Sequence, residues 1–211
     1  MKGTHILAID EGTTGVTALI FDRDGAISGR GYSEFPQHYP KPGWVEHDAN
    51  EIWSVTIKVV GAALENAKIK AVDLSAIGIT NQRETSVMWH RKNGKPAANA
   101  IVWQDRRTAE LCDRLRSEGL EPAWQEKTGL LLDPYFSGTK VRWMLENVKG
   151  LQKAAQKGDI AFGTIDSWLV WKLTGGACHI TDVSNASRTL LYNIRKLEWD
   201  ADILSRLGIP A

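Results

Sequence analysis

The stretch ILAIDEGTTGVTALIFDRDG, residues 6–25, contains two apolar runs separated by a short polar segment. Residues 6–9 are all apolar and lead directly into Asp10, and the second apolar run covers residues 16–21. Short apolar runs of this length, bounded by glycine and small polar residues, are typical of β-strands. The stretch therefore predicts two strands joined by a turn that carries two acids, a glycine and two threonines.

The residues after this stretch continue the same pattern and then change it. Asp22 to Gly25 read as a turn in which Gly25 takes a positive φ, and residues 26–35 predict a third strand. Three strands in a row predict an antiparallel meander. This order is unlike that of a Rossmann unit, which would place a helix after its first strand.

A helix and another strand follow. Asp48 is expected to cap a helix, with Glu51 three residues later as in a capping box. The expected apolar stripe of this helix is Ile52, Val55, Val59 and Ala62. Residues 74–80 read as a buried strand. A meander, a helix and a further strand indicate an α/β protein.

The second half of the chain is expected to be mostly helical. Residues 86–89 and 97–103 predict a hairpin around an Asn-Gly turn at 93–94. The apolar periodicity then predicts helices at about 106–118, 120–127, 137–147 and 150–156, a strand and a helix that Gly175 ends, and a short last helix at 200–208.

Composition narrows the class of protein. Hydrophobic residues make up 43% of the 211 residues, charged residues 24%, and the formal net charge is +1. These values are ordinary for a globular protein, and a near-neutral balance does not indicate a nucleic-acid or membrane-surface partner. Cys112 and Cys178 form no CxxC pair, so a reducing cytoplasm with two packed thiols is the simplest interpretation.

The turn after the first strand has the chemistry of a phosphate site. Gly12 allows close approach of a ligand, Thr13 and Thr14 supply hydroxyl donors, and Asp10 could hold a hydrated Mg²⁺. The alternative is a plain Gly-Thr turn whose hydroxyls bond to the local backbone. The sequence contains no GxxxxGK[ST] loop and no GxGxxG motif, so these residues alone leave both interpretations open.

Longer motifs resemble a known family. The segments AIDEGTT (8–14), GWVEHDANEIW (43–53), GITNQRETSVMWHRKNGKPAANAIVWQDRR (78–107), TGLLLDPYFSGTKVRWMLEN (128–147) and DSWLVWKLTGG (166–176) resemble the FGGY carbohydrate kinases, and within them the glycerol kinases. Residues 135–147 resemble the family's N-terminal signature along its whole length. The resemblance runs from about Ile6 to the end of the chain.

The resemblance implies a fold and a domain organisation. Family members have an actin-like ATPase fold, made of two ribonuclease H-like lobes with a mixed sheet and helices on both sides. Because members are roughly twice this length, residues 1–211 are expected to be the N-terminal lobe, lacking its last strands. The C-terminal lobe would carry the adenine site and the aspartate that acts as catalytic base, so no catalytic residue is expected in this chain.

The same resemblance assigns substrate-binding residues. Arg83 and Glu84 match the pair that contacts the glycerol hydroxyls, Trp103 would pack on the carbon chain, and Tyr135 would add a hydroxyl. Thr13 is also expected near the substrate. A carboxylate accepts from two hydroxyls and a guanidinium donates to their oxygens, which fixes the hydroxyl that reacts. Without the family, Arg83 and Glu84 read as a strand-end ion pair and Trp103 as a core residue.

In family terms the first turn faces the nucleotide. Thr13, Thr14 and Gly15 are expected to bind the phosphates of ATP, and Asp10 to hold Mg²⁺. Glycerol kinases commonly read DQGTTSSR here, whereas residues 10–17 of this chain read DEGTTGVT. Glu11 adds a negative charge beside the phosphate site, unless its side chain points away or helps to position Mg²⁺. Gly15 lacks the serine hydroxyl and keeps only a backbone N–H, and Thr17 lacks the arginine charge. The last change is expected to weaken nucleotide binding or transition-state stabilisation, because phosphoryl transfer depends on positioned positive charge.

The expected function is ATP-dependent phosphorylation of glycerol to sn-glycerol 3-phosphate, in the cytoplasm, with no nucleic-acid or membrane partner. Whether the full-length protein forms a homo-oligomer stays open. Three alternatives remain: a kinase of another polyol or sugar such as a pentulose or gluconate, a degenerate actin-like nucleotide-binding module, and a two-metal nuclease built on Asp10. The near-neutral charge argues against the nuclease.

Overall fold

A computed structural model describes residues 3–210. Their contacts divide the chain into two compact units. Unit 1 contains residues 3–37 and 49–82, and unit 2 contains residues 38–48 and 83–210. The expected N-terminal kinase lobe stays a prediction, and each unit is described by itself.

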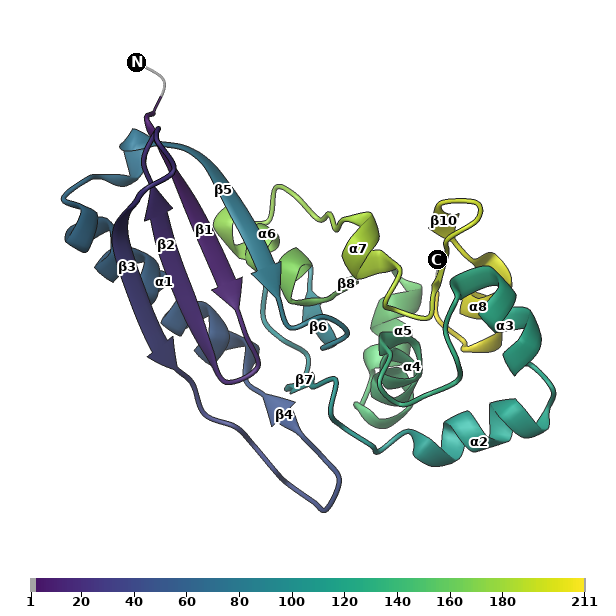
Figure 1. Ribbon diagram of the computed structural model, residues 1–211. Helices are drawn as coiled ribbons and strands as arrows, with labels where there is room; N and C mark the ends of the chain where they lie inside the picture. Colours follow the sequence, from purple (N-terminus) through teal and green to yellow (C-terminus); the bar gives the residue numbers. More distant parts are fainter. Residues whose placement is uncertain (1–2, 211) are drawn as a thin grey trace. The chain divides into compact units, whose positions relative to one another are not determined.

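Unit 1 is a mixed four-stranded sheet with one long helix. The strands β1 (His5–Glu11), β2 (Gly15–Phe21), β3 (Ile27–Glu34) and β5 (Leu74–Asn81) lie in the order β3-β2-β1-β5. β1 pairs antiparallel with β2 and parallel with β5, as Figure 1 shows. The predicted meander and the α/β class are therefore confirmed.

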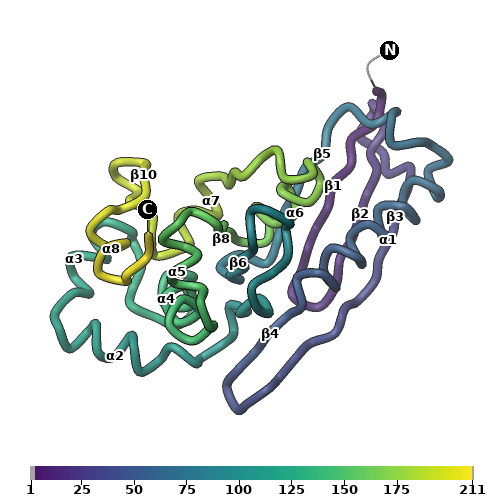
Figure 2. The backbone as a smooth tube through the Cα atoms, turned by 180° about the vertical axis from the view of Figure 1, so that it is seen from behind, coloured from purple at the N-terminus to yellow at the C-terminus, as the bar shows by residue number. Residues whose placement is uncertain are grey.

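The helix α1 (Ala49–Ala67) packs on β3 and β2, and Figure 2 shows it lying along that face of the sheet. Its buried residues include Ile52, Thr56, Val59 and Ala63, so the predicted stripe is right at Ile52 and Val59 but shifted by one position at the other two. A Cβ atom on Gly31 would lie 2.3 Å from the Val59 carbonyl oxygen, so only glycine permits this close packing. A short 3-10 turn, Ala71–Asp73, leads into β5.

The prediction of a buried fourth strand is wrong. Most residues of β5 are exposed, and Ile77 keeps 47% of its surface. The physical reason is its position, because β5 lies at the edge of the sheet and pairs only with β1 among the described residues. An apolar run can therefore mark an edge strand as well as a buried one.

Unit 2 is built from short strands and helices around two apolar clusters. The strands are β4 (Glu46–His47), β6 (Val87–His90), β7 (Ala100–Ile101), β8 (Ile160–Gly163), β9 (Tyr192–Asn193) and β10 (Glu198–Trp199), paired as β4-β7, β6-β8 and β9-β10. The helices are α2 (Ala109–Ser117), α3 (Glu121–Thr128), α4 (Ser137–Asn147), α5 (Leu151–Gln156), α6 (Ile165–Leu173), α7 (Val183–Ala186) and α8 (Ala201–Arg206).

The predicted helices of the second half are confirmed with small shifts at their ends. The predicted hairpin is right at its turn, where Gly94 has a φ of +64° and the His90 N–H donates to the Lys95 carbonyl. Its second arm is shorter than expected, because β6 forms its regular ladder with β8 instead. Cys112 is buried, whereas Cys178 is exposed and not packed as predicted. No helix within residues 3–210 is both long and apolar enough to cross a membrane.

Candidate functional site

Hydrogen bonds from other residues of unit 1 hold the backbone carbonyl groups of the turn between β1 and β2. The Gly12 carbonyl accepts from the Gln82 side chain at 3.2 Å, the Thr13 carbonyl from the Gln37 side chain at 3.0 Å, and the Thr14 carbonyl from a backbone N–H at 3.3 Å. Because these three oxygens are bonded inward, the turn does not present a ring of carbonyl oxygens to a ligand. This arrangement suits an anion better than a bare cation.

Asp10 lies at the end of β1 with a hydroxyl on each side. The strand register pairs it with Thr17 in β2 and with Thr80 in β5, so the three side chains share one face of the sheet. Asp10 and Thr14 are exposed. Sequence reasoning missed Thr80, whose position beside Asp10 follows only from the parallel pairing of β1 with β5.

The residues around Asp10 offer Mg²⁺ a single carboxylate and no complete set of protein ligands. No group of three or more His, Cys, Asp or Glu residues within the described chain could hold a metal ion. Mg²⁺ is usually bound by one or two carboxylates together with phosphate oxygens and water, so one exposed carboxylate is compatible with that pattern. Asp10 would be the residue that holds the ion.

Glu11 points to the opposite side of the strand and is fully buried. Its Oε1 accepts from the Gln82 side-chain amide at 3.0 Å, and its Oε2 has no hydrogen-bond partner. Burial raises the pKa of Glu11 from 4.5 to about 8, with a smaller contribution from the nearby Asp10. The expected additional negative charge is therefore largely absent at neutral pH, because the protonated form of the carboxyl predominates.

Close packing accounts for the glycine at position 15. A Cβ atom there would lie 2.8 Å from the Ser33 carbonyl oxygen and 3.1 Å from the Tyr32 hydroxyl. Tyr32 is paired with Thr17 across β2 and β3, so the Tyr32 side chain crosses above the start of β2. A side chain at position 15 would require β3 to move.

Unit 2 places Glu84 in a strained and closely held conformation. Its φ is +65°, which is unusual for a residue with a side chain. The Glu84 carbonyl accepts from the Ser86 hydroxyl at 3.2 Å and from the Ser137 hydroxyl at 3.0 Å. The residue is buried, and Arg83 beside it is exposed. Strain of this kind persists only where surrounding contacts impose it, and it is concentrated at functional sites.

Two of the other predicted substrate residues are in contact. The ring centres of Trp103 and Tyr135 lie 5.3 Å apart with 54° between the ring planes, and the backbone N–H of Trp103 donates to the Thr85 hydroxyl. The Tyr135 carbonyl accepts from the Lys140 ammonium at 2.5 Å. Lys140 is fully buried, and burial lowers its pKa to about 7 against the opposing effect of nearby carboxylates, Asp105 first.

Arg188 links Tyr135 to Glu84 and was missed by the sequence analysis. Its Nε donates to the Glu84 carboxylate at 2.5 Å, and its guanidinium lies 5.5 Å from the Tyr135 ring centre and 5.0 Å from that of Phe136. Arg188 is 104 residues from Glu84, and no local pattern in the sequence marks it. Glu84, Trp103, Tyr135 and Arg188 thus form one connected group in unit 2.

Asp105 has a structural role beside this group. Its carboxylate is buried, accepts two hydrogen bonds from the Arg107 side chain and one from the Val45 N–H. Arg106 points outward and pairs with the exposed Asp133. The ion pair that matters for Asp105 is therefore with Arg107 and not with the neighbouring Arg106.

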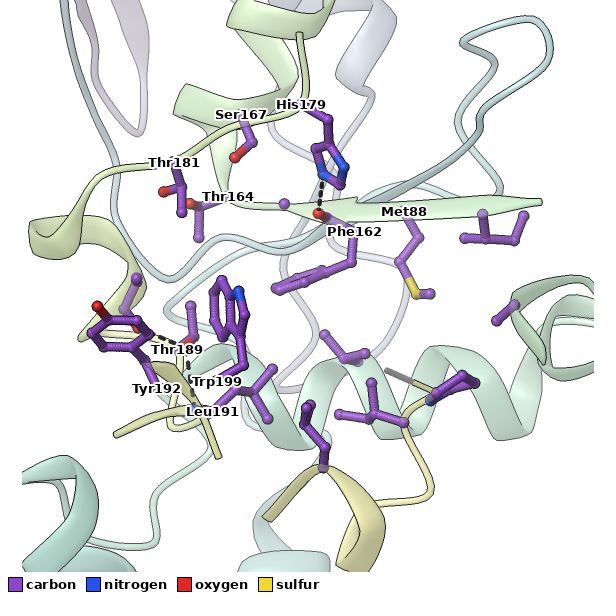
Figure 3. Close-up of a pocket in the computed structure, with 18 of the residues that line it drawn as sticks. Met88, Phe162, Thr164, Ser167, His179, Thr181, Thr189, Leu191, Tyr192 and Trp199 are labelled. Atoms are coloured by element: carbon purple, nitrogen blue, oxygen red, sulfur yellow. Dashed lines mark hydrogen bonds between the residues drawn. The ribbon is translucent and has the colours of Figure 1, made fainter. Parts of the chain in front are cut away.

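Two hollows lie within unit 2. An open depression of about 710 Å³ is lined by Tyr135, Arg188, Arg106, Arg116 and the 129–133 segment. A larger cavity of about 800 Å³ contains none of the predicted site residues. Figure 3 shows its mainly apolar wall with the hydroxyls of Thr164, Ser167 and Thr181 above it.

The hydroxyls of the larger cavity are already bonded within the protein. Those of Thr164 and Thr181 donate to Asp166, and that of Ser167 donates to the Ile180 carbonyl. His179 is bonded to the Phe162 carbonyl at 2.8 Å, as Figure 3 shows. A ligand there would have few polar groups to orient it, so the cavity is not assigned as the site.

Comparison with known proteins shows the family of the chain. Residues 5–211 match the FGGY family of carbohydrate kinases, N-terminal domain. The chain belongs to this family. Among relatives of this FGGY chain, glycerol kinase from Deinococcus radiodurans is 62% identical over 206 residues, 98% of this chain and 41% of the relative. Glycerol kinase from Carboxydothermus hydrogenoformans is 56% identical over the whole chain and 42% of the relative.

Solved structures of FGGY kinases show the same fold. Plasmodium falciparum glycerol kinase, solved with ADP, matches with a TM-score of 0.91 at 37% identity, over 97% of this chain and 40% of that one. Gluconate kinase from Lactobacillus acidophilus matches with a TM-score of 0.86 at 22% identity, over 97% of this chain and 40% of the other, which supports the fold alone. The predicted fold class is confirmed. The chain spans about two fifths of the length of the curated relatives it matches.

Proposed function

We propose that the full-length protein is a cytoplasmic glycerol kinase, which transfers the γ-phosphate of ATP to a primary hydroxyl of glycerol. The observation that carries the proposal is the connected group of Glu84, Tyr135, Trp103 and Arg188 in unit 2. Relatives that are 56–62% identical over nearly the whole chain are named glycerol kinases, which supports the same choice of substrate.

The substrate residues have complementary chemical roles in this proposal. The Glu84 carboxylate accepts hydrogen bonds from glycerol hydroxyls, and the exposed Arg83 donates to their oxygens. The Trp103 and Tyr135 rings pack on the carbon chain, with the Tyr135 hydroxyl as a further partner. Holding a triol by both its hydroxyls and its carbons selects which hydroxyl is phosphorylated.

Unit 1 serves the nucleotide. Thr13 and Thr14 would donate hydroxyl hydrogen bonds to phosphate oxygens, and Gly15 would contribute its backbone N–H. Thr13 is the residue we also assign to the substrate. Asp10 would hold Mg²⁺, and the bound ion supplies positive charge that screens the phosphate oxygens. The base that takes the proton of the attacking hydroxyl is expected outside this chain.

The test is an assay of the full-length protein for ADP release with glycerol, a pentulose and gluconate in parallel. Release selective for glycerol supports the proposal. Release selective for another acceptor would make that compound the substrate and would leave the FGGY family unchanged. Folded protein that releases no ADP with any of the three would favour the degenerate binding module, for which the missing charge at Thr17 is the specific observation.

Substitution of Glu84 tests whether this residue binds glycerol. Glu84→Gln should raise the KM for glycerol about 10- to 100-fold, the cost of losing a hydrogen bond to a charged group. Glu118→Gln, at the exposed end of α2, is the matched control and should leave the KM unchanged. An unchanged KM in the Glu84 variant would remove this residue from the site.

A further inference from the structure

We infer that Arg188 is a positioning residue for the acceptor alcohol: it holds Oε1 of Glu84, so that Oε2 faces the substrate hydroxyl. The inference rests on the proposed function and adds to it a residue that neither the sequence motifs nor the comparisons assign. Arg188 acts through Glu84 and Tyr135 and has no direct part in phosphoryl transfer.

The first support is the charge balance around Glu84. The Glu84 side chain is only 3% exposed, whereas that of Arg188 is 28% exposed. A buried carboxylate needs a cation or several donors to stay charged. Arg188 is the closest charged partner of Glu84 in the structure, with its Nε 2.5 Å from Oε1.

The second support is that Arg188 contacts two of the predicted substrate-binding residues, Glu84 and Tyr135. Its guanidinium lies over the Tyr135 and Phe136 rings while its Nε holds Glu84. An arginine can do both because it is planar, stacks on aromatic rings and donates along its edge. A lysine offers a point charge and would keep at most one of these contacts.

The third support is the anchoring of the Arg188 backbone. The Arg188 N–H donates to Asn185, and the carbonyl of the next residue, Thr189, accepts from Gly138 at 2.7 Å. Gly138 follows Ser137, whose hydroxyl holds the Glu84 carbonyl. The start of α4 therefore fixes Glu84 directly through Ser137 and indirectly through Arg188.

These contacts explain how Glu84 keeps its unusual backbone. A φ of +65° is a strained backbone conformation that persists only where surrounding contacts impose it. Two serine hydroxyls fix the Glu84 carbonyl, and Arg188 fixes the carboxylate. Without Arg188, the carboxylate would rotate away from the orientation in which it can accept from the substrate.

The experiment compares Arg188→Ala, Arg188→Lys and Arg188→Gln in the full-length protein, with Arg195→Ala as control. Arg195 lies in the exposed segment between β9 and β10, so its removal deletes an equal side chain away from Glu84. We measure KM and kcat for glycerol, KM for ATP, and the thermal midpoint of each variant.

We expect Arg188→Ala to raise the KM for glycerol about 10- to 100-fold, as for a lost hydrogen bond to a charged group, with the KM for ATP within about twofold. Arg188→Lys should lie between the wild type and Arg188→Ala. Guanidinium ions added to Arg188→Ala should restore part of kcat/KM and have no such effect on Arg195→Ala.

Two deoxy substrates test whether Arg188 acts through a substrate hydroxyl. Propane-1,2-diol and propane-1,3-diol each lack one hydroxyl of glycerol and retain a primary one. If Glu84 holds the missing hydroxyl, the penalty of Arg188→Ala should be smaller with that diol than with glycerol, since the interaction is already lost.

The outcomes separate the inference from the proposed function. A wild-type protein inactive with glycerol overturns both. An active wild type with an unchanged glycerol KM in all three Arg188 variants overturns the inference alone. So does a penalty that falls equally on glycerol, both diols and ATP together with a lower thermal midpoint, because that pattern indicates a purely structural role.

Discussion

The carboxyl group of Glu11 faces the side-chain amide of Gln82, with Oε1 at 3.0 Å from Nε2 and Oε2 without a partner. Because burial raises the pKa of Glu11 to about 8, the neutral form of this carboxyl predominates at pH 7. A protonated glutamate has nearly the shape of the glutamine that glycerol kinases commonly carry at this position. Glu11 therefore differs little from that glutamine in charge at neutral pH and differs by a full negative charge at alkaline pH.

Replacing Glu11 by glutamine should make this pH dependence visible. The folded state favours the protonated carboxyl, so its stabilising contribution is intact below pH 4.5 and is lost as the pH rises toward about 8. Glutamine does not titrate. We expect the thermal midpoint of Glu11→Gln, relative to wild type, to rise by about 5 °C or more between pH 5 and pH 8. A difference that stays constant with pH would contradict the assignment.

Replacing Gly31 by alanine should loosen the contact between β3 and α1. The added Cβ would lie 2.3 Å from the Val59 carbonyl oxygen, and overpacking of this kind costs about 1–3 kcal/mol. The matched control is Gly78→Ala in β5, where an added Cβ meets nothing within 4 Å. Thermal melts that show equal midpoints for the two variants would disprove the close packing.

Introducing an arginine at position 17 should strengthen nucleotide binding, if the proposed function holds. Thr17 pairs across the strands with Asp10, so a longer side chain there shares the face that we assign to the phosphates. We expect Thr17→Arg to lower the KM for ATP about tenfold, and the uncharged Thr17→Gln to leave it unchanged. Equal KM values for the two variants would show that charge at this position does not reach the nucleotide.

Removing Arg107 should destabilise unit 2 far more than removing its neighbour. The Arg107 guanidinium pairs with Asp105 and Glu46, is 2% exposed, and lies 3.7 Å and 4.6 Å from the ring centres of Trp44 and Trp143. Breaking a buried ion pair from one side costs about 3–5 kcal/mol. Arg106→Ala is the control, because its exposed pair should cost at most about 1 kcal/mol. Urea unfolding that ranks the two variants equally would refute this account.

Local signals in the sequence predicted most of the elements. Alternating and periodic apolar residues located the meander, α1 and the helices of the second half, because those patterns depend on near neighbours. The exposure of β5 and the pairing of β6 with β8 could not be predicted in this way. Both depend on which strand lies next to which, and an apolar run carries no information about its neighbour.

The candidate site divides in the same manner. The motifs identified Glu84, Trp103 and Tyr135. In the structure Arg188 connects Glu84 to Tyr135, and the Trp103 ring contacts the Tyr135 ring. Arg188 and Thr80 were missed because only the folded chain brings them to their partners. The protonation of Glu11 was also unforeseen, since it follows from burial and not from the residue type.

The parallel pairing of β1 with β5 has a consequence for the order of folding. Ile9 pairs with Ile79, so this ladder must close a long stretch of chain, whereas β1, β2 and β3 are joined by short turns. Closing a long loop costs more chain entropy before any contact compensates for it. The meander should therefore form early and β5 should join it late, so that amide groups of β5 gain protection from hydrogen exchange after those of β2.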